Sequence, residues 1–225
     1  MVRYLKNKNM LSQEECDLLL GKSVCIVGCG GLGGYIIEMI GRIGVGKITA
    51  VDGDVFDLTN LNRQLLCTEE HIGKGKAQAA KERMSKVNSD VAFTAITEYM
   101  TEENAEDILR GHDLVIDALD SIAARFILQE HASKLGIPMI YGAIAGWYGQ
   151  VSTIMPGSDF LSRIYRHHEG KGHEAQLGNP SFSPALVASI EVSEAVKVLI
   201  GRGETLDGKL LMIDLLSNEF EVLFE

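Results

Sequence analysis

Residue types suited to handling a phosphate compound lie close together near the start of the chain. A cluster of glycines, GCGGLGG at 28–34, directly follows the apolar run 24–27. Glycine lets the backbone approach a phosphate without an intervening Cβ, and the free N–H groups of a following helix attract that phosphate. An acid after the next apolar run can accept hydrogen bonds from both hydroxyls of a ribose. The spacing therefore predicts a nucleotide site formed by Gly28, Gly30, Gly31, Gly33 and Asp52.

These residues need a strand, a tight turn, a helix and a second strand to bring them together. The runs 24–27 and 48–51 are typical of buried strands, and the stretch between them has leucine and isoleucine at helical spacing. This order, ending in an acid, is the βαβ unit of nucleotide-binding proteins. A glycine turn that only packs a helix against a sheet is the plainer interpretation, and the position of Asp52 favours nucleotide binding over it. The unit alone does not distinguish ATP from NAD.

The middle of the chain continues the alternation. Its predicted elements are a helix at 74–88, a strand at 91–96, a helix at 102–109, a strand at 114–116, a helix at 122–135 and a strand at 139–141. In the first of these helices, the apolar face leaves Lys76 on the side expected to be exposed. The alternation predicts an α/β protein with a Rossmann-like, doubly wound and mainly parallel sheet, covered by helices on both faces.

The C-terminal third breaks this pattern. A strand at 150–155 has no helix before it and is expected to run antiparallel, as are two further strands at 210–213 and 220–224. Residues 156–182 have little periodicity and are predicted to form a mobile crossover loop.

Two sequence signals indicate where helices begin. Ser12 and Glu15 form a capping box, which predicts a short helix within an N-terminal helical arm at 1–22. Ser183 followed by Pro184 is expected to cap the long helix of the C-terminal third.

Composition limits the classes of function. The chain has 225 residues without a linker, so we expect a single domain, 1–225. Its net charge of −10 disfavours nucleic acids and anionic membranes as partners. No stretch of the sequence resembles a signal peptide, no apolar run reaches membrane-spanning length, and the four cysteines include no CxxC pair. These features predict a cytoplasmic enzyme with unpaired thiols.

Five motifs together carry a resemblance to a known family. They are CGGLGG (29–34), AVDGD (50–54), TNLNRQ (59–64), GKGKA (73–77) and DALDS (117–121). With them the chain resembles the adenylating enzymes for ubiquitin-like proteins, the ThiF/MoeB/HesA family, from about Arg3 to its C-terminus. Members include adenylyltransferases of molybdopterin synthesis and thiamine biosynthesis and the ubiquitin-activating enzymes.

The resemblance implies ATP-dependent adenylation. A carboxylate at the end of a partner's flexible tail attacks the α-phosphate of ATP and expels pyrophosphate. Because both reactants are anions, the site needs positive charge, and Arg63 and Lys76 are expected to act as catalytic clamps on the phosphates. Asn60 and Gln64 are expected to bond phosphate or ribose oxygens.

The resemblance also implies a magnesium site. Asp120 follows a parallel strand, at the edge of the sheet where ligands bind. It is expected to hold the Mg²⁺ ion that bridges phosphate oxygens of ATP. Ser121 beside it, and Asp54 near the ribose, complete the expected cofactor-binding residues.

The implied partners are a small ubiquitin-like sulfur-carrier protein that ends in Gly-Gly and a second copy of this chain. Arg3-Tyr4 resembles the family's Arg-Tyr-x-Arg segment, through which one subunit of the dimer supplies an arginine to its neighbour's site. Here Lys6 stands in place of the second arginine, and lysine lacks the bidentate fork.

The sequence departs from the family in its metal and thiol residues. It lacks the two CxxC pairs that hold a structural zinc in many bacterial relatives, so no zinc site is expected. The segment 156–182 has no cysteine, which excludes covalent thiol catalysis there. His167, His168 and His173 are interpreted as exposed loop residues rather than metal ligands.

Three other functions remain open. DALDS resembles the tRNA threonylcarbamoyladenosine dehydratases, although the acidic balance and the C-terminal elements argue against that branch. An NAD-dependent oxidoreductase would use the glycine turn and Asp52 but leave Arg63 and Lys76 without a role. A non-catalytic adaptor would explain the missing zinc and thiol, but not the full set of charged phosphate-binding residues.

Overall fold

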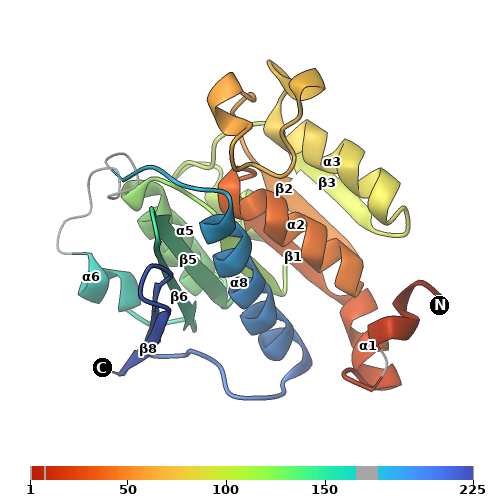
Figure 1. The fold of residues 1–225 in the computed structure, drawn as a ribbon. Coiled ribbons are helices and arrows are strands. Elements are labelled where there is room, and N and C mark those ends of the chain that lie inside the picture. Colours follow the sequence, from red (N-terminus) through yellow and green to blue (C-terminus); the bar gives the residue numbers. More distant parts are fainter. Residues whose placement is uncertain (1, 8, 166–176, 225) are drawn as a thin grey trace.

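The computed structural model describes residues 2–7, 9–165 and 177–224, and Figure 1 shows the arrangement of their helices and strands. In chain order they are α1 (Gln13–Gly21), β1 (Ser23–Val27), α2 (Gly31–Ile43), β2 (Lys47–Val51), α3 (Lys76–Val87), β3 (Ala92–Ile96), α4 (Ala105–Leu109), β4 (Leu114–Asp117), α5 (Ile122–Lys134), β5 (Met139–Ala145), β6 (Tyr148–Ile154), α6 (Phe160–Ile164), α8 (Phe182–Ile200), β7 (Lys209–Asp214) and β8 (Glu219–Phe224).

One eight-stranded sheet organises the chain, in the order β3-β2-β1-β4-β5-β6-β7-β8. The strands from β3 to β5 pair in parallel, and β6, β7 and β8 are added antiparallel. The predicted fold class is therefore confirmed, including the antiparallel C-terminal strands. The strand order reverses direction between β1 and β4, and parallel α/β sheets bind ligands at the carboxyl ends of strands beside such a reversal.

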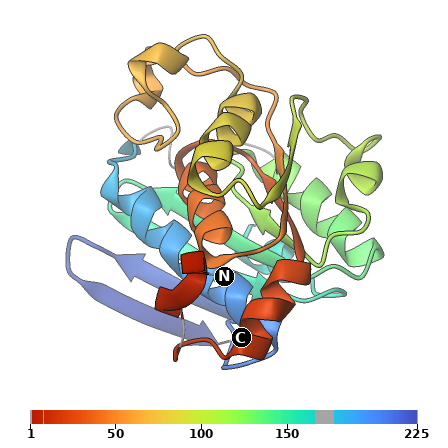
Figure 2. The ribbon, with the colours of Figure 1, turned by 90° about the vertical axis from the view of Figure 1, so that its right-hand side faces the viewer.

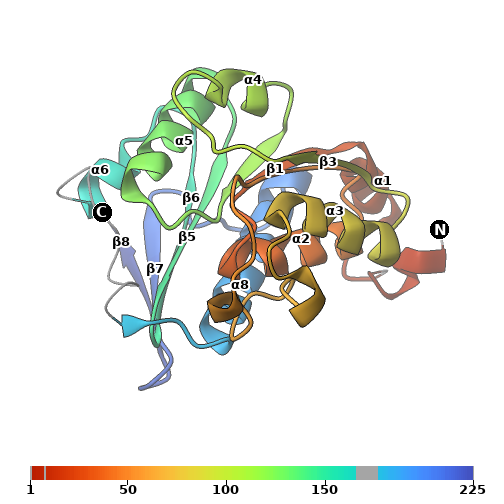
Figure 3. The same ribbon diagram turned by 90° about the horizontal axis from the view of Figure 1, so that it is seen from above.

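Helices cover both faces of the sheet, as the view from above shows in Figure 3, with α4 and α5 on one side and α2, α3 and α8 on the other. On the α2 side, Ile36, Ile37 and Ile40 are fully buried with side chains of α8. On the α5 side, Leu109 and Leu128 are equally buried. Both faces of the parallel strands are thus apolar, which explains their nearly continuous hydrophobic runs.

The N-terminal segment is fastened at the amino ends of the strands. Asn88 Nδ2, just before β3, donates to Tyr4 Oη at 2.7 Å, and Arg3 pairs with Asp90 at 3.5 Å. Figure 2 shows this segment and α1 at the opposite end of the molecule from the loops that follow β2. The predicted capping box is present, with Glu15 N–H donating to Ser12 Oγ.

Two predictions in the C-terminal third are wrong. The helix α8 begins at Phe182 with Ser181 as its N-cap residue, so Ser183 does not cap it; Ser183 Oγ instead donates to Gly146 O at 2.6 Å. The segment 156–182 is not loop throughout, because the buried side chains of Phe160 and Leu161 place the short helix α6 against the core.

His167, His168 and His173 lie outside the described residues. Among the helices that the structure describes, none combines the length and the apolar character needed to cross a membrane.

Candidate active site

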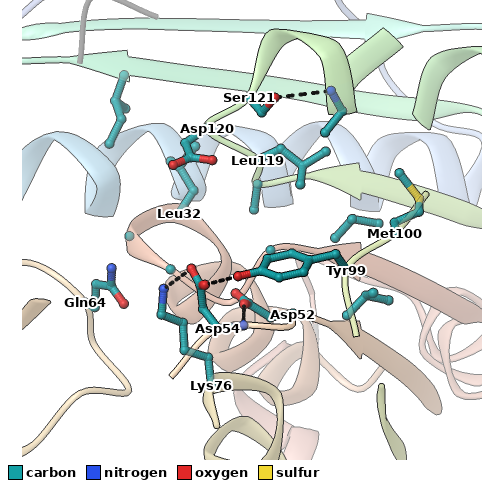
Figure 4. Close-up of a pocket in the computed structure, with 18 of the residues that line it drawn as sticks. Leu32, Asp52, Asp54, Gln64, Lys76, Tyr99, Met100, Leu119, Asp120 and Ser121 are labelled. Atoms are coloured by element: carbon teal, nitrogen blue, oxygen red, sulfur yellow. Dashed lines mark hydrogen bonds and ion pairs between the residues drawn. The ribbon is translucent and has the colours of Figure 1, made fainter. Parts of the chain in front are cut away.

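A cavity of about 370 Å³ opens at the carboxyl ends of β1, β2 and β4, and Figure 4 shows its lining. We call it the first cavity. Of the predicted site residues, it brings together Gly28, Gly30, Gly31, Asp52, Asp54, Arg63, Gln64, Lys76, Asp120 and Ser121.

Two glycines make the turn at the base of this cavity. Gly28 has φ +102°, and a Cβ on it would lie 2.4 Å from Ala118 O. A Cβ on Gly33 would lie 1.9 Å from Gly28 O, so Gly33 permits the first turn of α2 to pack on the glycine turn. Gly33 does not line the cavity itself; it allows the close packing that places the N–H groups of the turn there.

Asp52 ties the end of β2 to the glycine turn. Its Oδ2 accepts a hydrogen bond from Cys29 N at 2.7 Å, and its Oδ1 accepts one from Asp54 N at 2.8 Å. Burial raises the pKa of this carboxyl, and the two backbone N–H groups and Lys76 oppose that effect. Each carboxylate oxygen has a second lone pair, so the fixed carboxylate can still accept hydrogen bonds from a ligand hydroxyl.

Lys76 is buried, and the expectation that it is exposed is wrong. It is the first residue of α3, its backbone N donates to Asp54 O at 2.9 Å, and only 8% of the residue is exposed. Its Nζ lies 3.1 Å from Asp54 Oδ2, and the Tyr99 hydroxyl donates to Asp54 Oδ1. The prediction from helical periodicity was wrong because the first turn of α3 faces the loop after β2 rather than solvent.

The 58–64 segment supplies three polar side chains with different placements. Arg63 reaches the first cavity, and its Nη1 donates to Thr59 O and Asn62 Oδ1. Gln64 is 6% exposed, and its Oε1 has no hydrogen-bond partner among the described residues. Asn60 does not line the first cavity; its Oδ1 accepts from Asp57 N and shapes the loop that presents Arg63 and Gln64.

Asp120 lies at the border between two cavities. It lines the first cavity and also a second cavity of about 320 Å³, which extends over β5 and β6. Ser121, next in the chain, caps α5 by accepting from Ala124 N. The second cavity has a largely apolar lining of Ile122, Ala143, Ile144, Ala145, Tyr148, Gly149 and Ile164, with Arg125, Gln150 and Tyr165 as further polar members.

A buried polar network supports the wall between the cavities. Arg125 Nη1 donates to Tyr165 Oη at 2.7 Å, and its Nε lies 3.5 Å from Asp117 Oδ2. Asp117 Oδ1 accepts from Leu119 N, in the turn that carries Asp120. Burial raises the pKa of Asp117 to about 6, while Arg125 and the backbone hydrogen bond oppose the shift. The network thus contacts the turn that carries Asp120 through Leu119, whose backbone O also accepts from Arg125 Nη2.

Acids outnumber bases around the first cavity. Among the described residues, its charged lining residues are Asp52, Asp54, Glu98 and Asp120 against Arg63 and Lys76. Any highly anionic ligand would therefore need additional positive charge from a cation or from another chain.

Several lining residues have no signal in the motifs, notably Tyr99, Met100 and Asn179. Tyr99 and Met100 follow β3, so their position after a parallel strand indicated the crevice, although their types did not. Asn179 comes from the segment before α8 and could be placed only with the fold known.

The described residues contain no cluster of three or more histidine, cysteine or acidic side chains that could hold a metal. The four cysteines are unpaired; Cys25, Cys29 and Cys67 are buried and Cys16 is half-buried. Burial raises the pKa of Cys29, the one within the glycine turn, well above its usual value. A thiol with that pKa is a poor nucleophile.

Comparison with known proteins identifies the family of this chain. The ThiF family model matches residues 4–224. The chain belongs to the ThiF family. Similar ThiF relatives include the Thermus thermophilus sulfur carrier protein adenylyltransferase, 36% identical over 93% of this chain and 81% of the relative. The Haloferax volcanii SAMP-activating enzyme E1 is 32% identical over 91% of this chain and 77% of the relative.

A solved structure shows the same fold. The Escherichia coli tRNA N6-threonylcarbamoyladenosine dehydratase, determined in complex with AMP, superposes with a TM-score of 0.77. It is 21% identical, with 89% of this chain and 95% of that chain covered. The resemblance read from the five motifs is thus confirmed at the level of family and fold.

Proposed function

We propose that this ThiF-family protein is an ATP-dependent adenylyltransferase that activates the C-terminal carboxylate of a small ubiquitin-like sulfur-carrier protein. It forms an acyl-adenylate and releases pyrophosphate. The observation that carries the proposal is the pair of adjoining cavities that share Asp120. One is lined by the glycine turn, Asp52, Arg63 and Lys76, and the other has a largely apolar lining. The names of the relatives supply the class of that second substrate.

The first cavity suits ATP. The glycine turn and the start of α2 offer backbone N–H groups to phosphates. Lys76 and Arg63 bring positive charge to its lining, and Asp52 can hold a ribose. A pentavalent α-phosphate gains negative charge on its oxygens, so both cations would stabilise the transition state more than the ground state.

A bound Mg²⁺ ion would offset the excess of negative charge in the first cavity. Within the described part of the chain, four carboxylates face two cations there, and a triphosphate would add further negative charge. Asp120 is exposed, faces both cavities and offers the hard oxygen ligand that Mg²⁺ prefers. When bound, Mg²⁺ would neutralise phosphate charge, while the Asp117–Arg125 network contacts the Asp120 turn.

The second cavity suits the tail of the carrier. A Gly-Gly end has no side chains, which suits a largely apolar cavity whose lining includes the small residues Ala143, Ala145 and Gly149. Its carboxylate would reach the α-phosphate at the border marked by Asp120. None of the cysteines is exposed and none lies in 156–182, so the acyl-adenylate would pass to a separate sulfur donor.

We further propose a homodimer that works in the cytoplasm. The segment with Arg3 and Lys6 is held at the amino ends of the strands, and the first cavity lies at their carboxyl ends. A basic residue from this segment would therefore serve the site of a second copy. Four free cysteines suit a reducing compartment.

The rival functions are less well supported. The similarity to the tRNA dehydratase is a similarity of fold at 21% identity, and a chain of net charge −10 would repel tRNA. An NAD-dependent oxidoreductase would use the glycine turn and Asp52 but would leave Arg63 and Lys76, which line the first cavity, without a role.

Two measurements test the proposal. Calorimetric titration should show that ATP with Mg²⁺ binds far more tightly than NAD. Exchange of labelled pyrophosphate into ATP should then require a carrier protein with an intact Gly-Gly end, and a carrier truncated by two residues serves as the control. Tight NAD binding without an ATP signal would overturn the proposal, as would exchange that does not depend on the tail.

A further inference from the structure

Tyr99 lines the first cavity and is carried by a loop that Asn104 braces. Asn104 Nδ2 donates to Tyr99 O at 3.0 Å, and Asn104 Oδ1 accepts from Thr101 N at 2.7 Å, which fixes the loop after β3. The Tyr99 side chain points toward Asp54, which lies between Tyr99 and Lys76 in Figure 4. The residue is 62% exposed, so its position follows from these contacts and not from burial in a core.

Asp54 is shared between Tyr99 and Lys76. Its Oδ1 accepts from the Tyr99 hydroxyl, and its Oδ2 lies 3.1 Å from Lys76 Nζ. Its backbone is also fixed at both polar atoms, because Asp54 N donates to Asp52 Oδ1 and Asp54 O accepts from Lys76 N. The hydrogen bond to Asp54 raises the pKa of Tyr99, so the hydroxyl keeps its proton and remains a donor.

We propose that Tyr99 is a positioning residue for Lys76 and acts through Asp54. The Tyr99 hydroxyl holds Asp54 Oδ1, so Asp54 Oδ2 stays directed at Lys76 Nζ. This contact keeps the ammonium group of Lys76 directed into the first cavity. The hydroxyl also withdraws charge from Asp54, so that an incoming phosphate can draw Nζ away from the carboxylate. This inference rests on the proposed binding of ATP in the first cavity and adds a residue that none of the motifs contains.

The simpler role for Tyr99 is that of a wall against which a nucleotide base stacks. The ring lies close against the backbone of Gly53, where a Cβ would come within 2.8 Å of Tyr99 Cδ2. The two roles differ in the atom that matters. Stacking needs the ring, which phenylalanine retains, whereas positioning needs the hydroxyl and affects only ligands that carry phosphates.

Tyr99→Phe separates these roles. Removing a hydrogen bond to a partly exposed charged group should weaken binding of ATP with Mg²⁺ by about 3- to 10-fold. Binding of adenosine, measured by competition with a fluorescent ATP analogue, should change by less than about two-fold. Tyr35→Phe, in the half-buried α2 tyrosine that packs against the core, is the control and should change neither affinity.

A double-mutant cycle with Asp54→Ala completes the test. Asp54→Ala removes an acid from a site that already has an excess of acids, so ATP binding should stay measurable. In that background Tyr99→Phe should have no further effect on ATP affinity. The inference is overturned if Tyr99→Phe leaves the affinity for ATP unchanged or lowers the affinity for adenosine by the same factor. It is also overturned if the effects of the two substitutions on ATP affinity are additive. A parent protein that binds no ATP would overturn the proposed function and this inference with it.

Discussion

The two halves of the site are built in different ways. The first cavity lies on the parallel strands and is made mostly from short motifs, with backbone N–H groups and a few charged side chains in defined positions. The second cavity lies over β5 and the antiparallel strand β6 and combines side chains from α5, α6 and both strands. Nucleotide chemistry therefore depends on local backbone geometry, whereas the partner's site depends on the packing of distant segments. Variants in the two halves should fail in different ways.

The largest effect is expected from Lys76→Met. Methionine keeps the length of the buried side chain but removes the charge that the phosphates need. Loss of one preorganised charge from a phosphoryl-transfer site costs on the order of 100- to 1,000-fold in rate. Pyrophosphate exchange in the presence of the carrier should fall by that factor. Lys81→Met, on the exposed face of the same helix α3, should exchange at the parental rate.

A loss of similar or somewhat smaller size is expected from Asp120→Ala. If Asp120 holds Mg²⁺, exchange should drop by about 100-fold at low magnesium and recover in part when magnesium is raised. The exposed Asp107→Ala in α4 is the matched control. A loss that does not respond to magnesium would place Asp120 in contact with the substrate rather than the metal.

The nucleotide half was the more predictable from sequence, for a physical reason. The glycine turn, Asp52 and the DALDS turn each follow a strand of the parallel sheet, so strand order alone brings them to one edge. Burial of Lys76 was missed because the loop after β2 packs over the first turn of α3. Asn60 was expected to touch the ligand, whereas its amide oxygen closes a turn in the loop.

The partner's half, meaning the half of the site around the second cavity, could not be predicted in the same way. The lengths of β5 and β6 exceed the short apolar runs that marked them, and Arg125 had no pattern to distinguish it from a surface residue. Its burial against Asp117 and Tyr165 requires the packed fold. The helix α6 was missed because it is short and lies in an aperiodic stretch, with two fully buried side chains, Phe160 and Leu161, and Ile164 packed partly against the core.

A smaller effect, confined to the partner's half, is expected from Ala145→Phe. The added ring would fill part of the second cavity and raise the KM for the carrier, with a loss of about 10- to 100-fold in kcat/KM. The affinity for ATP should change by less than about two-fold, because the first cavity is unaltered. Ala92→Phe on the exposed side of the edge strand β3 is the control. Equal losses of affinity for ATP and for the carrier would show that the two halves of the site do not act independently.

The smallest effect concerns Glu191, which lies beneath the partner's half. Its carboxyl group packs against Gly142 of β5, is fully buried and has no hydrogen-bond partner among the described residues. Burial and the nearby charge of Asp117 raise its pKa well above the usual 4.5. The folded protein therefore retains a proton that the unfolded chain releases, and it loses stability as pH rises above 4.5 toward the folded pKa.

Glu191→Gln removes this penalty with almost no change of shape. The variant should match the parent near pH 4.5 and melt about 2–4 °C higher near pH 8, by differential scanning calorimetry. Glu194, one turn along on α8, provides the contrast, because its Oε2 accepts from Thr153 Oγ1 and Leu206 N at 2.7 Å. Glu194→Gln should therefore destabilise the protein, by about 1–3 kcal/mol. A Glu191→Gln variant less stable than the parent at pH 8 would mean that the buried carboxylate is charged and satisfied.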